Sequence, residues 1–174
     1  MISIDSRVST KAPVQCSTML MSHVCVLPQG SHNRGVAFES HIRHRMGQVE
    51  LSDQVEVMSW LGSVTGYLDL ERVAVTGWSY GGYLSLMALA QYPKLFKVRC
   101  PARLLLPSRK IWPYNRSNER LSDLLQVSIA GAPVSNWSAY DTGYTERYMG
   151  LPAANASGYR LGSVLNYVND FPEE

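Results

Sequence analysis

The sequence predicts an α/β fold, in which helices flank a mostly parallel β-sheet. Apolar residues recur at helical spacing from Leu51, an apolar strand-like run follows at residues 72–76, and a second apolar stretch covers residues 83–90. Alternating helices and strands are typical of parallel strands joined by right-handed crossovers. The chain has 174 residues, of which 45% are hydrophobic, so we expect one domain.

The individual elements have local signals at their ends. Residues 1–5 predict a short strand that ends in a carboxylate, and residues 127–131 predict the strand that follows the second helix. For the first helix, Ser52 or Asp53 is available as the N-cap, and Gly66 stands beyond the C-terminal end. Its core-facing positions are predicted to be Leu51, Val55, Met58, and Leu61 or Gly62.

The turn after the central strand carries a G-x-S-x-G motif, Gly77-Trp78-Ser79-Tyr80-Gly81. Between a strand and a helix, this motif is typical of the nucleophile elbow of α/β-hydrolases, where the serine hydroxyl projects above the sheet. The glycines let the two arms of the turn pass without Cβ clashes. The helix that starts there aims free N–H groups at an oxyanion. We therefore predict an α/β-hydrolase fold around this turn.

Composition excludes several other classes of function. The net charge is +2, and the excess of basic over acidic residues lies in residues 98–126 and 8–29, so we expect no nucleic-acid partner. No apolar stretch is long enough to predict a membrane span. The cysteines, Cys16, Cys25 and Cys100, have neither metal-ligand nor disulfide-framework spacing, and we expect no metal and no cofactor.

A second group of residues is aromatic. Trp137, Tyr140, Tyr144 and Tyr148 would share one face of a helix. Such a stripe is either part of the core or the wall of an aromatic pocket near Ser79, and the pattern alone leaves both interpretations open.

Three stretches together resemble the dipeptidyl peptidase IV family of serine peptidases, in the prolyl oligopeptidase class. They are Gly-Trp-Ser-Tyr-Gly-Gly-Tyr at 77–83, Ala-Gly-Ala-Pro-Val at 130–134 and Tyr-Asp-Thr-Gly-Tyr-Thr-Glu-Arg-Tyr-Met-Gly at 140–150. Residues 84–89 and 141–144 look most similar to the cytosolic branch, dipeptidyl peptidases eight and nine. The resemblance favours the pocket interpretation of the aromatic residues.

The resemblance implies a post-proline or post-alanine dipeptidyl aminopeptidase that works through an acyl-enzyme. It implies peptide substrates with Pro or Ala at the penultimate position, a cytoplasmic location, and homodimers among full-length relatives. A pocket lined by flat aromatic rings suits a pyrrolidine ring, which has no hydrogen-bond donor. The implied residues are Ser79 as nucleophile, Tyr80 as backbone oxyanion donor, and Val134, Trp137, Tyr140 and Tyr144 as the substrate pocket.

The chain departs from the family pattern downstream of Ser79. The triad of α/β-hydrolases runs Ser, Asp, His along the chain, and a serine without a base is a poor nucleophile. Here Asp141 and Asp170 do not stand in the family's His-Gly-x-x-Asp setting, and every histidine precedes the serine: His23, His32, His41 and His44. We therefore expect residues 1–174 by themselves to be inactive.

Two alternatives share much of this sequence. A non-catalytic interaction fragment or pseudoenzyme would share every residue and would lack only the triad. An esterase or lipase of the same fold would share the elbow, but it would not be expected to carry the stretch at 140–150.

Two segments do not resemble the family, residues 8–29 and 98–126. Deleting either segment joins flanking residues whose sequence resembles the family. Both segments begin with Val and end with Gln, as translated in-frame introns bounded by GT and AG would. We therefore expect residues 1–174 to be one partial peptidase domain, starting and stopping inside the hydrolase domain. The two segments are expected to be unstructured insertions from unspliced introns.

Overall fold

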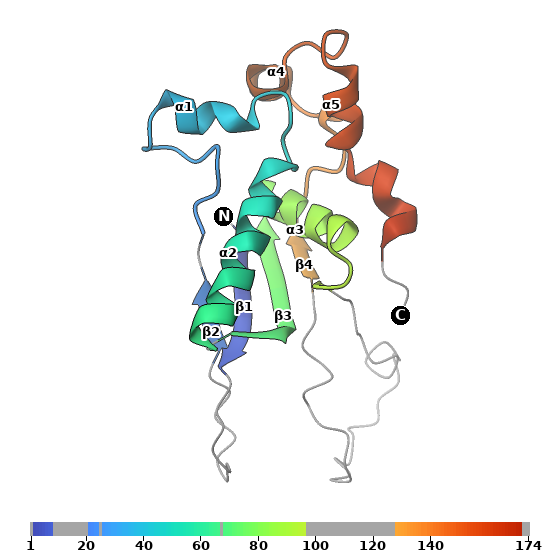
Figure 1. The fold of residues 1–174 in the computed structure, drawn as a ribbon. Coiled ribbons are helices and arrows are strands. Elements are labelled where there is room, and N and C mark those ends of the chain that lie inside the picture. The colour runs from blue at the N-terminus through green and yellow to red at the C-terminus, as the bar shows by residue number, and fades with distance from the viewer. Residues whose placement is uncertain (1, 9–20, 25, 67, 97–127, 172–174) are drawn as a thin grey trace, which may run out of the picture.

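The computed structural model describes residues 2–8, 21–24, 26–66, 68–96 and 128–171. Its strands are β1 (Ile2–Val8), β2 (Met21–Val24), β3 (Leu68–Trp78) and β4 (Ser128–Gly131). Its α-helices are α1 (Val36–Glu39), α2 (Val49–Thr65), α3 (Tyr80–Gln91), α4 (Thr142–Met149) and α5 (Ala156–Leu161). The 3-10 helices are η1 (Ser40–Ile42), η4 (Trp137–Ala139) and η5 (Val164–Asp170). Figure 1 shows their arrangement.

The four described strands form one sheet in the order β2-β1-β3-β4. β3 and β4 are parallel, with Gly77 opposite Ala130 and Trp78 opposite Gly131, so both strands end at the same edge. β1 is antiparallel to both β2 and β3. The predicted α/β class is confirmed. The expected parallel pairing is found in the β3–β4 pair, whose crossover includes α3, whereas the rest of the described sheet is antiparallel.

The first segment expected to be an unstructured insertion contains a strand. Residues 21–24 form β2, which pairs with β1 from Ile4 opposite Val24 to Arg7 opposite Met21. The expectation for residues 8–29 is corrected at these positions, because a strand next to β1 satisfies backbone groups that a free coil would leave to water. The second segment, residues 98–126, lies outside the described residues.

Helix α2 begins earlier than its sequence signals predicted. Neither Ser52 nor Asp53 caps it, and Asp53 instead accepts a hydrogen bond from the backbone of Gln29 at 2.7 Å. The C-terminal end is confirmed, since Gly66 adopts the left-handed conformation at φ 60°. Two of the predicted core positions, Leu51 and Met58, are buried, which confirms the helical spacing.

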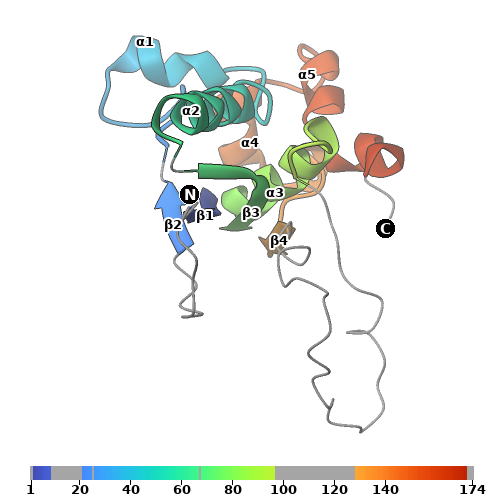
Figure 2. The ribbon, with the colours of Figure 1, turned by 60° about the horizontal axis from the view of Figure 1, so that its bottom comes forward.

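Helix α3 is the centre of the core. Nine of its twelve residues are buried, which is expected of a helix that is apolar all round. It packs on β3 and β4, with α2 beside it and η5 against its far side (Figure 2). The core includes Val73 and Val75 from β3, Met58 from α2 and Met87 from α3.

The helices α4 and α5 lie beyond the ends of β3 and β4, near the start of α3 (Figure 1). Ligands of α/β sheets bind outside the carboxyl ends of their strands. The turn that carries Ser79 therefore lies at the edge where a site is expected.

Candidate active site

Ser79 occupies a sharp turn between β3 and α3. Its φ is 56° and its ψ is −114°, a left-handed conformation that a side chain other than glycine rarely adopts. Its backbone N–H donates to the carbonyl of Gly131 at 2.9 Å, which ties the turn to the end of β4. Its side chain is exposed, and the hydroxyl has no hydrogen-bond partner among the described residues. The strained turn and the exposed side chain are the geometry expected of a nucleophile elbow.

Two glycines allow this turn to form. A Cβ on Gly77 would overlap the backbone carbonyl of Gly81 and lie 2.8 Å from its Cα. A Cβ on Gly82 would lie 2.5 Å from the carbonyl oxygen of Gly131. The glycines are therefore required by the close approach of α3 to β3 and to the end of β4.

The start of α3 faces the exposed hydroxyl. Tyr80 is the first residue of the helix, so its backbone N–H has no acceptor within the helix. The positive end of the helix dipole lies at the same place. An anion that forms on a carbon bonded to Ser79 Oγ would find this N–H group close by.

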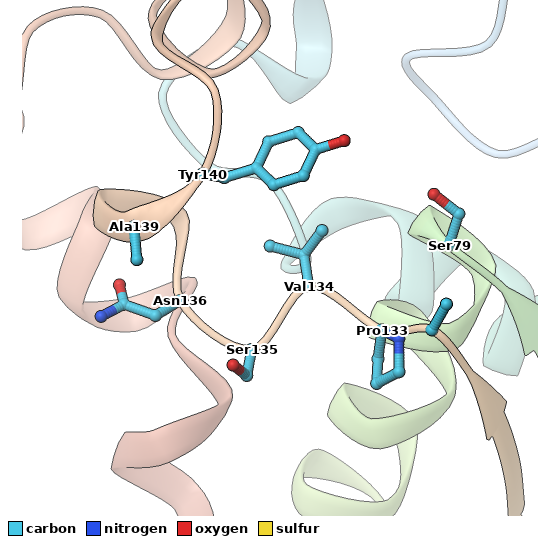
Figure 3. Close-up of a pocket in the computed structure, with 8 residues that line it drawn as sticks. Ser79, Pro133, Val134, Ser135, Asn136, Ala139 and Tyr140 are labelled. Atoms are coloured by element: carbon cyan, nitrogen blue, oxygen red, sulfur yellow. The ribbon is translucent and has the colours of Figure 1, made fainter.

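A pocket of about 270 Å³ opens beside Ser79. Val134 and the ring of Tyr140 face the same hollow as the Ser79 hydroxyl (Figure 3). The two side chains make this part of the wall apolar. The full lining is Ser79, Ala132, Pro133, Val134, Ser135, Asn136, Ala139 and Tyr140.

The aromatic residues form a cluster behind the pocket. Trp137 is 1% exposed and lies at the centre. Its ring centroid is 5.7 Å from that of Tyr140, 6.1 Å from that of Tyr144, with which it is stacked, and 5.0 Å from that of Tyr83. Trp137 and Tyr144 do not line the pocket, so of the four predicted substrate residues only Val134 and Tyr140 do. The core and pocket interpretations therefore each describe part of the cluster.

The expected single helical face is wrong. Trp137 belongs to η4, whereas Tyr144 and Tyr148 belong to α4. Asp141 separates the two helices, because its carboxylate accepts a hydrogen bond at 2.7 Å from the backbone N–H of Tyr144 and caps α4. Asp141 therefore has a structural role here.

Glu50 is a site residue that sequence reasoning missed. It is 3% exposed and lies in the first turn of α2, where its carboxylate accepts hydrogen bonds from the Gly47 N–H and the Tyr80 hydroxyl. Burial raises the pKa of Glu50. Burial, and then the charge of Glu50, raise the pKa of Tyr80, so this phenol stays protonated. The sequence signal was a glycine three residues before an acid at a helix start, which resembles a capping arrangement.

We expect the stability that Glu50 contributes to fall as the pH rises. A carboxyl whose pKa is raised on folding favours the folded state fully below its unfolded value, near 4.5, and loses that contribution as the pH rises through the folded value. The free energy of unfolding of wild type minus that of Glu50→Gln should therefore decrease above pH 4.5 and then level off. Urea titrations at a series of pH values measure it. Glu56→Gln, at an exposed position of the same helix, is the control variant. If the difference between wild type and Glu50→Gln rises with pH, the expectation is contradicted.

The histidines of the described loops have other partners. The backbone of His44 donates to the carbonyl of Tyr148 at 2.8 Å, and its own carbonyl accepts from Asn155 at 3.0 Å. The ring of His32 lies 3.3 Å from the carboxylate of Glu39. None of these three contacts involves the serine. Within the described part of the chain, no three His, Cys, Asp or Glu side chains are grouped so that they could hold a metal ion.

The strand, strained serine turn and buried helix have the arrangement of an α/β-hydrolase domain. The family model described as the prolyl oligopeptidase family matches residues 16–103. The chain belongs to this family, as the three motifs predicted.

Known relatives agree with this assignment. The chain is 45% identical to dipeptidyl peptidase 8 of Mus musculus and of Homo sapiens, over 84% of this chain and 13% of either relative. It is 35% identical to venom dipeptidyl peptidase 4 of Vespa velutina, over 82% of this chain and 15% of the relative. The chain therefore spans only a small part of the length of the curated relatives it matches. The predicted resemblance to dipeptidyl peptidases is confirmed.

A solved structure has the same fold. The crystal structure described as a dipeptidyl aminopeptidase IV from Bacteroides ovatus matches with a TM-score of 0.62 and 32% identity, over 82% of this chain and 16% of that one. Across the residues that the structure describes, every helix is too short or too polar to cross a bilayer.

Proposed function

We propose that this chain is part of the catalytic domain of a serine dipeptidyl aminopeptidase, with Ser79 as its nucleophile. The observation that carries the proposal is the exposed Ser79 hydroxyl at φ 56°, beside a pocket with an apolar wall. The names of the relatives, which are dipeptidyl peptidases, support peptides as the substrates.

The geometry fits acyl transfer. The Ser79 oxygen attacks the carbonyl carbon of the scissile bond, and the backbone N–H of Tyr80 donates to the oxyanion that forms. The amine product leaves with a proton, and water then hydrolyses the acyl-enzyme. A general base must take the serine proton, and the family pattern supplies it from a His downstream. We therefore propose that the polypeptide of residues 1–174 has no useful peptidase activity alone.

The pocket supports a preference for small apolar residues at the penultimate position. Val134 and Tyr140 offer apolar surface to a ring that needs no hydrogen bond, as in proline, or to the methyl group of alanine. Trp137 and Tyr144 act from behind, because they hold the Tyr140 ring by edge-to-face contacts. By family, we also propose a cytoplasmic enzyme that forms homodimers and needs no cofactor.

Ser79→Ala should abolish peptidase activity in the full-length protein that carries this chain. Removing a nucleophile costs about 10⁶-fold in the rate of a serine peptidase. The measurement is hydrolysis of a dipeptide with penultimate proline, together with labelling by a fluorophosphonate probe. Ser85→Ala, which changes a buried serine bonded to the carbonyl of Gly81 at 2.8 Å, is the control and should keep its label. A Ser79→Ala protein that is still labelled would refute the assignment.

A non-catalytic role is the second candidate. It is favoured by one observation, the absence of a hydrogen-bond partner for the Ser79 hydroxyl in the described residues. The fluorophosphonate probe distinguishes a peptidase from a non-catalytic protein, because the full-length form of a pseudoenzyme would not be labelled.

A further inference from the structure

The carboxylate of Glu50 lies buried beneath the elbow, and the proposed reaction does not use it. A buried acid is costly unless its oxygens accept hydrogen bonds. The Gly47 nitrogen lies 3.1 Å from Glu50 Oε1 and 3.0 Å from Glu50 Oε2, and its N–H donates to both. The Tyr80 hydroxyl donates to Oε1. The carboxylate therefore joins the start of α2 to the first residue of α3.

The peptide that precedes Glu50 is itself held against α3. The Tyr83 hydroxyl donates to the Met46 carbonyl at 3.0 Å, and the Gln91 side chain donates to the Gly47 carbonyl at 2.9 Å. Gly47 has a φ of 79°, and a Cβ there would overlap the Tyr83 hydroxyl. The backbone at Gly47, whose N–H binds the Glu50 carboxylate, is thus held to α3 by Tyr83 near the start of α3 and by Gln91 at its end.

The Tyr80 ring lies between this anchor and the aromatic cluster. Its centroid is 5.7 Å from that of Trp137 and 5.5 Å from that of Tyr83. Because the hydroxyl donates to Glu50, it is not free to donate to a substrate. Since Tyr80 follows Ser79 directly, a ring fixed at its hydroxyl end also fixes the first peptide of α3.

We propose that Glu50 is a positioning residue for the serine site. By holding the Tyr80 hydroxyl, it keeps the Tyr80 N–H aimed at the oxyanion position and keeps the ring packed behind Trp137. The catalytic consequence rests on the proposed function, whereas the contact itself does not. No hydrogen bond joins Glu50 to Ser79, so Glu50 acts only through Tyr80.

The contact is tested by proton NMR of the 174-residue chain. A phenol proton that is buried and donated to a carboxylate should give a downfield resonance that is absent in Tyr80→Phe. Glu50→Gln should shift it upfield, and Glu56→Gln, on the exposed side of the same helix, should leave it in place. If Tyr80→Phe removes no resonance, or Glu50→Gln leaves it unmoved, the contact is overturned.

The positioning role is tested by the rate at which a fluorophosphonate labels the full-length protein. Glu50→Gln and Tyr80→Phe should each slow labelling about tenfold, less than the 10²–10³-fold loss when an oxyanion donor is removed. The double variant should be no slower than either single variant, because the two residues act as a unit. Circular dichroism checks that each variant is folded at the temperature used.

The two failures are distinguishable. A wild type that is not labelled refutes the proposed function, and the phenol resonance still decides whether Glu50 holds Tyr80. Labelling at the wild-type rate in Tyr80→Phe, or additive losses in the double variant, would overturn the positioning role. Tyr80→Phe keeps the ring and removes only the hydroxyl, so it remains informative if Glu50→Gln does not fold.

Discussion

Gly77→Ala should destabilise the domain by about 3 kcal/mol or more, because the new methyl group has no room. Its Cβ would overlap the carbonyl of Gly81, which belongs to the backbone of α3 and cannot move as a side chain would. Either the helix shifts away from β3 or the strand bends, and both changes displace the Ser79 turn. We therefore expect the full-length protein to lose its fluorophosphonate label along with the loss of stability.

Gly143→Ala is the matched control for this change. A Cβ at Gly143 would lie 3.5 Å from Asp141 Oδ2, which is ordinary van der Waals contact. The free energy of unfolding should change by about 0.5 kcal/mol or less. Urea unfolding followed by circular dichroism measures both variants. Equal effects in the two would contradict the close packing at the elbow.

Trp137→Ala should cost about 3–5 kcal/mol, the range for a large aromatic side chain removed from a core. Trp137 is 1% exposed, and its ring contacts four tyrosines: Tyr80, Tyr83, Tyr140 and Tyr144. Its removal leaves a cavity and also frees the Tyr140 ring. We therefore expect the KM for a proline dipeptide to rise in the full-length enzyme, in addition to the loss of stability.

Trp60→Ala provides the comparison, because Trp60 is 59% exposed on α2. It should change the free energy of unfolding by about 0.5 kcal/mol or less and leave the KM unaltered. Both variants are measured by urea unfolding and by steady-state kinetics. If Trp137→Ala were as mild as Trp60→Ala, the aromatic cluster would not support the pocket.

The central part of the fold was predictable because its signals are local. The strand is specified by a short apolar run, the turn by glycines that flank Ser79, and helix α3 by a mostly apolar sequence. The end of α2 was predictable for the same reason, since Gly66 tolerates the left-handed conformation. These features depend on neighbours within a few residues.

The features that escaped prediction depend on residues far apart in the chain. β1 pairs antiparallel with β3, and no local pattern at Ile2–Val8 specifies the direction of its partner. The start of α2 was misplaced because Glu50, rather than Ser52 or Asp53, binds the free N–H before the helix. Burial of Glu50 requires Tyr80, which lies 30 residues away in the sequence.

The aromatic residues show the same limit within the site. The spacing predicted that Trp137, Tyr140, Tyr144 and Tyr148 share one helical surface. In the structure Asp141 caps α4, so Trp137 in η4 belongs to a different helix from Tyr144 and Tyr148. Only the packed structure distinguishes the buried Trp137 from Tyr140, which is 44% exposed and lines the pocket. The role of each aromatic residue was therefore not readable from its spacing.

The close approach of Gly82 to Gly131 has a consequence for how substrate choice can change in the proposed enzyme. The nucleophile turn is bonded to the strand end that leads directly into Pro133 and Val134, so this wall of the pocket and the reacting oxygen move together. Substitutions in that wall would alter turnover along with substrate choice. Tyr140 lies further along the chain, between η4 and α4, so evolution or engineering can vary it with less disturbance to the serine.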